Sequence, residues 1–165
     1  MDFTAEFRDG MALLAGAVSV VTTDGPRGRA GFTASAVCSV TDQPPTILVC
    51  MNRASFAHGY FVENGVLCVN VLSAAQEHHS RLFSDRNMTM AQRFSAVPWQ
   101  ALDTGAPALE GALVSMDSTI VQTHEVGTHS IFYAQLRRIR VLEEAGAGLV
   151  YFNRAYRSVE ARPQV

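Results

Sequence analysis

Apolar and polar residues alternate with a period of two in the stretch from Gly31 to Pro45, GFTASAVCSVTDQPP. Such alternation is typical of a half-buried strand, because successive side chains of a strand point to opposite faces. One face carries Phe32, Ala34, Ala36 and Cys38, and the other carries Thr33, Ser35, Val37 and Ser39. The hydroxyls either meet water and neighbouring backbone, or form a row of donors beside a flat polar ligand.

Runs rich in β-branched residues predict further strands. They are Ala17–Thr23, Thr46–Met51, Val66–Leu72, Leu109–Met116, Ser118–Thr123, His129–Leu142 and Gly148–Phe152. The run Thr46–Met51 is apolar almost throughout, which is typical of a strand buried on both faces. The run Val66–Leu72 contains a polar residue, Asn70, which must be hydrogen-bonded if it is buried. Asn70 therefore either braces a loop or contacts a ligand.

An N-terminal helix is predicted by apolar residues at helical spacing, and it would cover a barrel end or pack against a partner. These residues are Phe3, Phe7, Met11 and Leu14. A later helix from Ser73 to Phe83, capped by Ser73, would carry three polar residues on its solvent side. These are Gln76, His78 and His79. The polar, methionine-rich segment Ser84–Phe94 is typical of a mobile loop or the edge of a lid.

A further helix is predicted from Asn52 to about Asn64, with Asn52 or Ser55 as its N-cap. Arg53 lies between these two residues. The same helix start could therefore bind an anion through its free N–H groups, the helix dipole and the guanidinium. From the residues alone, capping is the simpler interpretation, because almost every helix needs a cap.

About seven strands and three helices follow one another in an order typical of an antiparallel barrel with inserted helices, rather than of a βαβ repeat. Asp24–Gly28 predicts a turn that joins Ala17–Thr23 to the alternating stretch as a hairpin. No G-x-G-x-x-G motif follows a strand, which excludes a Rossmann dinucleotide site. The sequence has no repeat or linker, so residues 1–165 are expected to form one mainly β domain.

Composition narrows the function further. The 165 residues are 48% hydrophobic and 17% charged, with a net charge of −2, so neither nucleic acid nor an anionic membrane is an expected partner. All 13 basic residues are arginine, which excludes lysine Schiff-base chemistry and a lysine phosphate loop. No apolar run is long enough to span a bilayer, and the N-terminus does not resemble a secretory signal. We therefore expect a cytoplasmic protein.

Few residues are candidates for catalysis. The three cysteines, Cys38, Cys50 and Cys68, have neither zinc nor redox-dithiol spacing, and we expect reduced, mostly buried thiols and no metal. His129 starts a strand just after a glycine turn, where it either points into a cleft or pairs with backbone. We find no catalytic triad order and no carboxylate pair suited to acid–base work. Such a protein is suited to hold a cofactor that does the chemistry itself.

Four stretches together carry a resemblance to a known family. They are GFTASAVCSVTDQPP at Gly31–Pro45, LCVNVL at Leu67–Leu72, GTHSIFYAQL at Gly127–Leu136 and GLVYFNRAYRSV at Gly148–Val159. The chain resembles the short-chain flavin reductases of two-component monooxygenases, especially the reductase component of 4-hydroxyphenylacetate 3-monooxygenase. The resemblance covers nearly the whole chain. It implies an FMN-binding split β-barrel, a Greek-key antiparallel barrel, that forms a homodimer with flavin at the subunit interface.

The family implies an NAD(P)H-dependent flavin reductase. Hydride passes from C4 of NADH or NADPH to N5 of free FMN or FAD, without a catalytic residue of the protein. Reduced flavin then diffuses to a flavin-dependent monooxygenase, here one that hydroxylates aromatic compounds. Few arginines are placed to bind a 2′-phosphate, so NADH is the expected reductant.

The matched positions imply cofactor-binding roles. The flavin ring would be lined by Phe32, Thr33, Ala34, Ser35 and Ala36, with Ser39 contributing. The flavin phosphate would lie near Asn52, Arg53 and Ser55, which raises the anion-site interpretation above capping. His129 would position the nicotinamide, and Arg154 and Tyr156 would close on that nucleotide. The segment FAHGYF departs from the relatives, which leaves the phosphate contacts and the choice between FMN and FAD open.

Other functions remain open at this point. A flavoprotein with tightly bound FMN could pass electrons to another acceptor, such as a cobalt corrinoid or an iron complex. A barrel could also bind flavin without useful turnover. A relative of pyridoxamine-phosphate oxidase is a further alternative, but such an enzyme usually uses lysine among its phosphate ligands, and this chain has none.

Overall fold

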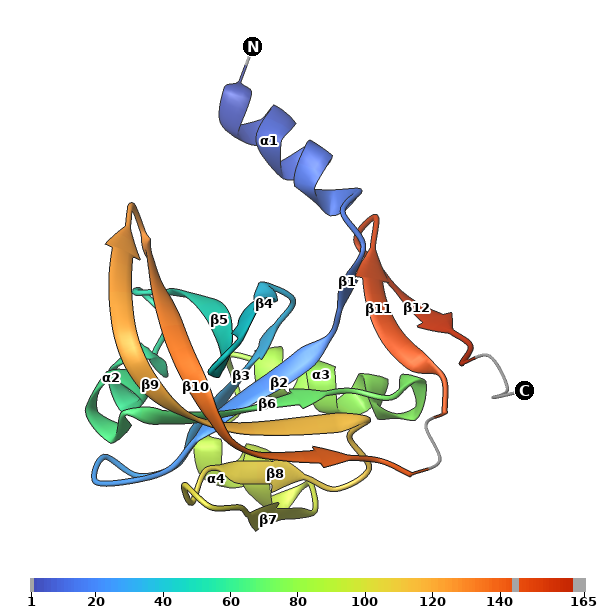
Figure 1. Cartoon of the computed structure of the whole chain (residues 1–165). Coiled ribbons are helices and arrows are strands. Elements are labelled where there is room, and N and C mark those ends of the chain that lie inside the picture. The colour runs from blue at the N-terminus through green and yellow to red at the C-terminus, as the bar shows by residue number, and fades with distance from the viewer. Residues whose placement is uncertain (1, 144–145, 162–165) are drawn as a thin grey trace.

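Seven antiparallel strands form the main sheet of the computed structural model, which describes residues 2–143 and 146–161 (Figure 1). The strand order is β3 (Ala30–Ala34), β2 (Ser19–Thr23), β6 (Val66–Val71), β9 (Val114–Val126), β10 (His129–Val141), β5 (Pro45–Asn52) and β4 (Val37–Asp42). The two edge strands, β3 and β4, follow each other in the chain but do not pair. The sheet is thus a barrel split between β3 and β4, which confirms the expected mainly β split-barrel fold.

Two smaller sheets lie beside the barrel. One contains β1 (Gly16–Ala17), β11 (Gly148–Phe152) and β12 (Ala155–Val159), and the other pairs β7 (Trp99–Ala101) with β8 (Pro107–Leu109). The predicted hairpin around Asp24–Gly28 is confirmed, because β2 and β3 pair antiparallel. The strand β7 lies outside the runs that were predicted as strands.

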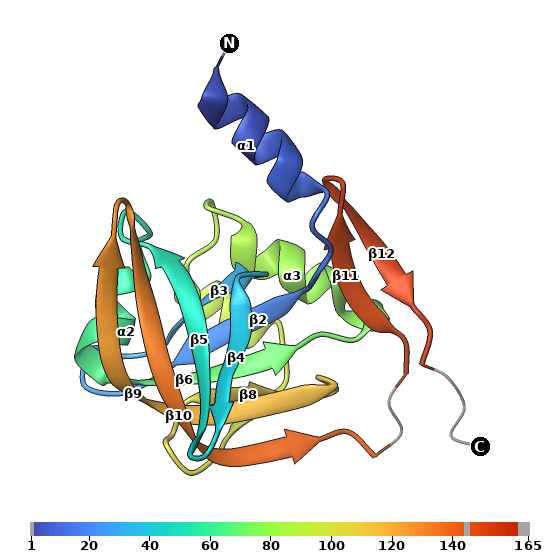
Figure 2. The same ribbon diagram turned by 45° about the horizontal axis from the view of Figure 1, so that its top comes forward.

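The N-terminal helix α1 (Phe3–Ala12) forms as predicted, with the Asp2 side chain accepting a hydrogen bond from the Thr4 N–H. It projects away from the barrel rather than covering its end (Figure 2). None of its residues is buried within this chain. The helix is attached to the β11–β12 turn, since the Asn153 N–H donates to the Ala12 carbonyl and Arg154 pairs with Asp9.

The inserted helices differ in part from the prediction. The helix expected from Asn52 begins only at α2 (His58–Asn64), and its N-cap is Ala57, so neither Asn52 nor Ser55 caps it. The helix expected from Ser73 is confirmed as a 3₁₀ turn (Ala74–Gln76) followed by α3 (Glu77–Ser84). Ser73 and Gln76 form a capping box at its start.

The segment Ser84–Phe94, expected to be a loop outside the core, contains α4 (Met90–Ser95) and buries two side chains. Phe94 packs in a core cluster with Phe83, and Arg93 is only 8% exposed. The prediction that Thr46–Met51 is a strand buried on both faces is also wrong. Ile47, Val49 and Met51 are buried while their neighbours are partly exposed, so this strand buries one face only.

Two other predictions of burial are wrong. Cys38 is exposed rather than buried, because it lies on the edge strand β4. His79 and Gln76, expected at the surface, are both 6% exposed, whereas His78 faces solvent. Burial, with a smaller effect of His78, lowers the pKa of His79 to about 4. The His79 ring is therefore neutral near pH 7 and can be buried without a counter-ion.

Asn70 was predicted either to brace a loop or to contact a ligand, and its hydrogen bonds show a bracing role. Its amide nitrogen donates to the carbonyls of Val20 and Pro107 at 3.1 and 3.2 Å. Its oxygen accepts from the Leu109 N–H and the Ser115 hydroxyl, both at 2.9 Å. These bonds tie β8 to the main sheet, and Asn70 is fully buried.

Among the helices in the described ranges, none has the length and apolar character that a bilayer crossing requires.

Candidate functional site

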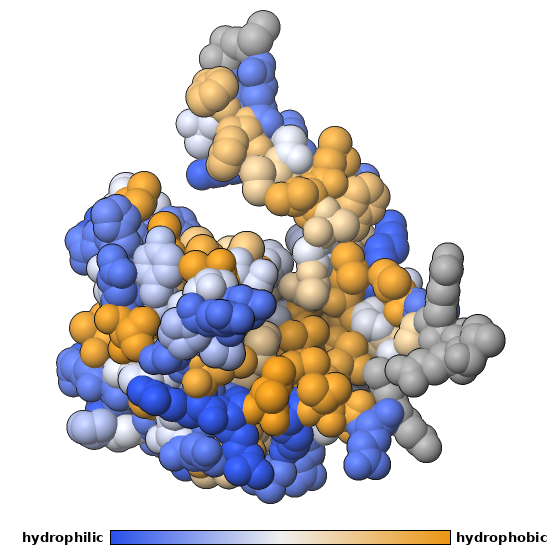
Figure 3. Space-filling view, viewed as in Figure 1, coloured by the Kyte–Doolittle hydropathy of each residue, from blue (hydrophilic) through white to orange (hydrophobic). Residues whose placement is uncertain are grey.

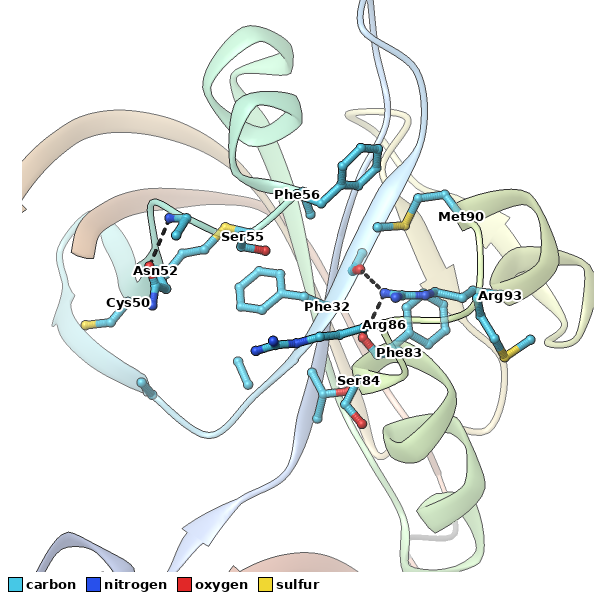
Figure 4. A pocket seen from close by; sticks show the side chains of 18 of the residues that line it. Phe32, Cys50, Asn52, Ser55, Phe56, Phe83, Ser84, Arg86, Met90 and Arg93 are labelled. Carbon is cyan, nitrogen blue, oxygen red and sulfur yellow. Dashed lines mark hydrogen bonds between the residues drawn. The ribbon is translucent and has the colours of Figure 1, made fainter. Parts of the chain in front are cut away.

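A cavity of about 730 Å³ lies beside the β3–β4 link, where the barrel is split (Figure 4). Its walls come from four parts of the chain: β3 and the link to β4, the end of β5 with the turn after it, the segment from α3 into α4, and the first residue of β10. The lining residues of the first two parts are Gly31–Ala36, Cys50–Asn52 and Ala54–Ala57. The others are Phe83, Ser84, Arg86, Met88–Met90, Arg93 and His129.

The alternating pattern of Gly31–Pro45 predicted a single strand, but this stretch forms the two strands β3 and β4. The break between them forms the first wall of the cavity. The chain bends at Ser35 and Ala36 and crosses to β5, where the Cys50 N–H donates to the Ala36 carbonyl. Gly31 allows β3 to approach α3 closely, because a Cβ there would lie 2.8 Å from the Phe83 ring. The small residues of this stretch thus let β3 pack closely against α3 and leave the cavity open beside it.

The second wall is a turn closed by its own residues. The Asn52 side-chain oxygen accepts from the Ala54 N–H at 2.9 Å, and the Ser55 N–H donates to the Asn52 carbonyl at 3.0 Å. The Arg53 side chain is directed to the β9–β10 hairpin, where it pairs with Glu125 at 2.9 Å and donates to the Gly127 carbonyl. Arg53 therefore fixes the hairpin that carries His129, and it does not line the cavity.

The third wall is held by Arg93, which lies almost fully buried behind it. Its guanidinium donates to the carbonyls of Phe83 at 2.9 Å and Gly31 at 3.3 Å, and also to that of Asp85. Burial lowers the pKa of Arg93, and the nearby Asp85 partly opposes this shift. Three backbone carbonyls thus anchor the segment Phe83–Arg93 to β3, so Arg93 is a structural cation rather than a free one.

Arg86 is the other cation of this wall, and unlike Arg93 it is not held by backbone carbonyls in the described part of the chain. Its side chain extends across the cavity toward the side formed by Asn52 and Ser55 (Figure 4). Within residues 2–143 and 146–161, Arg86 forms no ion pair. A guanidinium presents five N–H donors in a fixed fork, which suits a phosphate. The cavity therefore offers one available site for an anion.

Eight of the twelve residues predicted for cofactor binding line this cavity. They are Phe32, Thr33, Ala34, Ser35, Ala36, Asn52, Ser55 and His129. Ser39 is exposed on β4, and Arg53 points to the hairpin. Arg154 and Tyr156 line a second cavity, of about 600 Å³, together with Arg81 of α3. Ser84 borders both cavities, so the second one adjoins the first.

Two groups of the cavity, the Thr33 hydroxyl and the Cys50 thiol, are suited to binding rather than to nucleophilic chemistry. The Thr33 hydroxyl donates to the Ser80 carbonyl at 2.6 Å and can therefore only accept from a ligand. Burial raises the pKa of the Cys50 thiol, and Cys38 adds to this effect, so the thiol stays protonated near neutrality and is a poor nucleophile. The exposed His129 ring lies 2.9 Å from the Thr128 hydroxyl through Nδ1.

Sequence reasoning missed several lining residues, namely Phe56, Arg86, Met88, Met90 and Arg93. Most lie in the segment Ser84–Phe94, whose polar, methionine-rich composition had indicated only the edge of a lid. The two arginines of this segment, Arg86 and Arg93, were the signal that could have indicated a binding wall. Which arginine is buried by carbonyls and which is available depends on tertiary contacts.

Comparisons with known proteins agree with this fold. The family described as flavin reductase like domain matches residues 11–160. The FMN reductase (NADH) RutF of Serratia proteamaculans (strain 568) is 52% identical over 154 residues, which are 93% of this chain and 87% of that protein.

Two solved structures share the fold. BorF, the flavin reductase component of a bacterial two-component tryptophan halogenase, has a TM-score of 0.89 and 30% identity, covering 96% of this chain and 99% of that one. The NADH:FAD oxidoreductase SgcE6 of Streptomyces globisporus C-1027, solved with NAD and FAD fragments, has a TM-score of 0.87 and 26% identity. That match covers 98% of this chain and 94% of the other. From its fold, its cavity and a family match over most of its length, the chain belongs to the flavin reductase family.

Proposed function

We propose that the protein is an NADH-dependent flavin reductase that takes FMN as its flavin substrate. The observation that carries this proposal is the cavity at the split of the barrel, with an unpaired arginine directed into it and no activated nucleophile among its described residues. Its volume of about 730 Å³ lies within the range of small-molecule sites. Relatives at about half identity are named as NADH-dependent FMN reductases, which supports FMN and NADH over FAD and NADPH.

Each wall has a role in this proposal. The backbone and small side chains of Phe32–Ala36 lie along one side of the cavity and would line the flavin ring. Arg86 would bind the flavin phosphate, with the Ser55 hydroxyl on the facing wall. The flavin, when bound, supplies the hydride-accepting chemistry, and the protein contributes proximity and orientation, which can lower a barrier by roughly 7–11 kcal/mol.

The experiment that tests this proposal is NADH oxidation followed at 340 nm, without flavin and then with increasing FMN or FAD. We expect a rate that appears only with added flavin and saturates with it, with a lower KM for FMN than for FAD. A protein that is yellow as purified, and whose rate does not increase with free flavin, would instead carry flavin as a bound prosthetic group.

His129 is proposed to position the nicotinamide. It lies at the cavity on a hairpin that Arg53 and Glu125 hold in place, and its ring is exposed. Substituting His129→Ala should raise the KM for NADH about fivefold to tenfold, the loss of one hydrogen bond, while the KM for FMN changes little. Steady-state kinetics with each substrate varied in turn would measure this, and an unchanged KM for NADH together with an unchanged kcat would contradict the role.

Arg154 and Tyr156 are proposed to contact the rest of the nicotinamide nucleotide. Tyr156 is held by a 2.7 Å hydrogen bond to Ser80 of α3, and the cavity that these residues line adjoins the first at Ser84. A Tyr156→Ala variant measured in the same assay should raise the KM for NADH more than the KM for FMN.

A homodimer is proposed from the resemblance and from the apolar side of α1. Phe3, Phe7 and Met11 on this projecting helix, and Leu14 just after its end, are between 47% and 80% exposed, and apolar side chains are visible along the helix in Figure 3. Exposed apolar groups of this extent are typical of an interaction surface. Light scattering should give twice the chain mass of 17.9 kDa.

The reduced flavin is proposed to pass by diffusion to a flavin-dependent monooxygenase. Structural neighbours include the flavin reductase of a styrene monooxygenase from Pseudomonas putida S12. The finer proposal, that the partner hydroxylates 4-hydroxyphenylacetate-type aromatic compounds, rests on the four sequence stretches alone. Product formation by such a monooxygenase should depend on this reductase and NADH, and should persist when a membrane permeable to flavin separates the two proteins.

A further inference from the structure

Phe56 lies at the cavity with its side chain in solvent. It is 75% exposed, although it follows the end of β5 and directly precedes Ala57, which is 2% exposed in the main core cluster. The backbone on both sides is fixed, because the Ser55 N–H donates to the Asn52 carbonyl and the His58 N–H donates to the Ser55 carbonyl, both at 3.0 Å. The buried Ala57 and this closed turn hold the aromatic ring outward, at the rim.

The surroundings of Phe56 are apolar on one side and open on the other. Its ring packs at a tilt against Tyr60, with 5.8 Å between the ring centroids. Met88 and Met90 line the same cavity from the α4 side, and in Figure 4 the Met90 side chain points toward Phe56. Thioether side chains are unbranched and adapt their shape to an aromatic surface. The Phe56 ring and the Met90 side chain thus lie close to each other at the cavity that Arg86 enters, and Met88 lines the same cavity.

We propose that Phe56, together with Met88 and Met90, closes on the isoalloxazine ring of the bound flavin and sets how tightly flavin is held and how fast it leaves. This inference rests on the proposed function and adds a specificity-determining residue to it. A flat tricyclic ring would cover the Phe56 side chain, which is otherwise exposed to water, and aromatic faces pair favourably beyond the area they bury. The Phe56 side chain carries no hydrogen-bond donor, so it acts on the ring rather than on the phosphate.

The position and exposure of Phe56 lead to a sharp test. Phe56→Ala should raise the Kd of oxidised FMN and of riboflavin by the same factor, about tenfold, which corresponds to about 1.4 kcal/mol. Phe56→Leu, which keeps an apolar side chain but no aromatic face, should raise both by about threefold. Fluorescence anisotropy of the flavin, titrated with protein, measures each Kd.

Val62→Ala is the matched control. Val62 is an apolar residue on α2, 55% exposed, and does not line the cavity, so its truncation should leave both Kd values unchanged. The melting temperature of the Phe56 variants should stay close to that of the parent protein, because so little of the side chain is buried.

Two outcomes would overturn the clamp. One is a Kd within twofold of the parent value for both flavins in Phe56→Ala and Phe56→Leu. The other is a loss confined to FMN, because an effect on the phosphate alone would place Phe56 outside contact with the ring. Either result leaves the reductase proposal intact as long as the parent protein oxidises NADH in a flavin-dependent way. If that activity is absent, the proposed function fails instead.

Discussion

Replacing Arg86 by alanine is expected to raise the KM for FMN by roughly 10-fold to 100-fold and to leave the KM for riboflavin nearly unchanged. The reason is that hydrogen bonds to a charged group contribute about 1.5–3 kcal/mol, and only FMN carries the phosphate. Arg86 points into the cavity and has no ion pair within the described ranges, so the parent protein can give its full donor set to the ligand. Steady-state NADH oxidation with FMN and with riboflavin measures both values.

Arg86→Lys and Arg53→Ala make this test specific. A lysine keeps the charge but not the planar fork of donors, so Arg86→Lys should recover only part of the FMN affinity. Arg53→Ala distinguishes the structure from the sequence-based expectation, which placed the phosphate near Asn52–Ser55. If Arg53→Ala weakened FMN selectively and Arg86→Ala did not, the phosphate would bind at that turn and our assignment of Arg86 would be wrong.

Replacing Asn70 by alanine should lower the free energy of unfolding by about 3 kcal/mol, because each buried polar group left without a partner costs about 1–3 kcal/mol. The buried Leu109 N–H and the Ser115 hydroxyl lose the oxygen they share, and the Pro107 carbonyl loses the amide nitrogen as a donor. Since Asn70 is fully buried, water cannot replace these bonds without a local opening. Equilibrium unfolding in urea, monitored by Trp99 fluorescence, measures the change.

Ser115→Ala provides a graded comparison for Asn70. Ser115 donates one of the bonds to the Asn70 oxygen, so its loss should cost about 1 kcal/mol. Neither Asn70 nor Ser115 lines the cavity, so both variants should keep the KM for FMN of the parent at temperatures where they are folded. A cost below 1 kcal/mol for Asn70→Ala would mean that β8 is held mainly by other contacts.

Much of the fold could be predicted from local pattern. Strands such as β6 and β10 follow from β-branched, apolar runs, and the β2–β3 hairpin follows from the composition of Asp24–Gly28. These predictions succeed because strand periodicity and turn chemistry depend on residues close in sequence. Predictions that concern long-range burial were less reliable. His79 was expected in solvent because the pattern of its helix does not reveal which neighbours cover it.

The candidate site shows the same division. The pattern of Phe32–Ala36 and the position of His129 after a glycine turn each left a ligand-facing role as one of two alternatives, and the family resemblance favoured that role for both. Both line the cavity in the structure. The choice between Arg53 and Arg86 could not be made in this way. Arg53 is occupied by Glu125, which is 72 residues away in the chain, and no local pattern predicts that pair.

The amino-acid sequence by itself determined the strand-rich pattern and the family resemblance, because both depend on residue types and their local order. Only the tertiary structure decided where the barrel splits, that Asn70 ties β8 to the main sheet, and that Arg86 rather than Arg53 points into the cavity. These features depend on which groups meet across the fold. A polar side chain is available to a ligand only if the folded chain has not already supplied its partner.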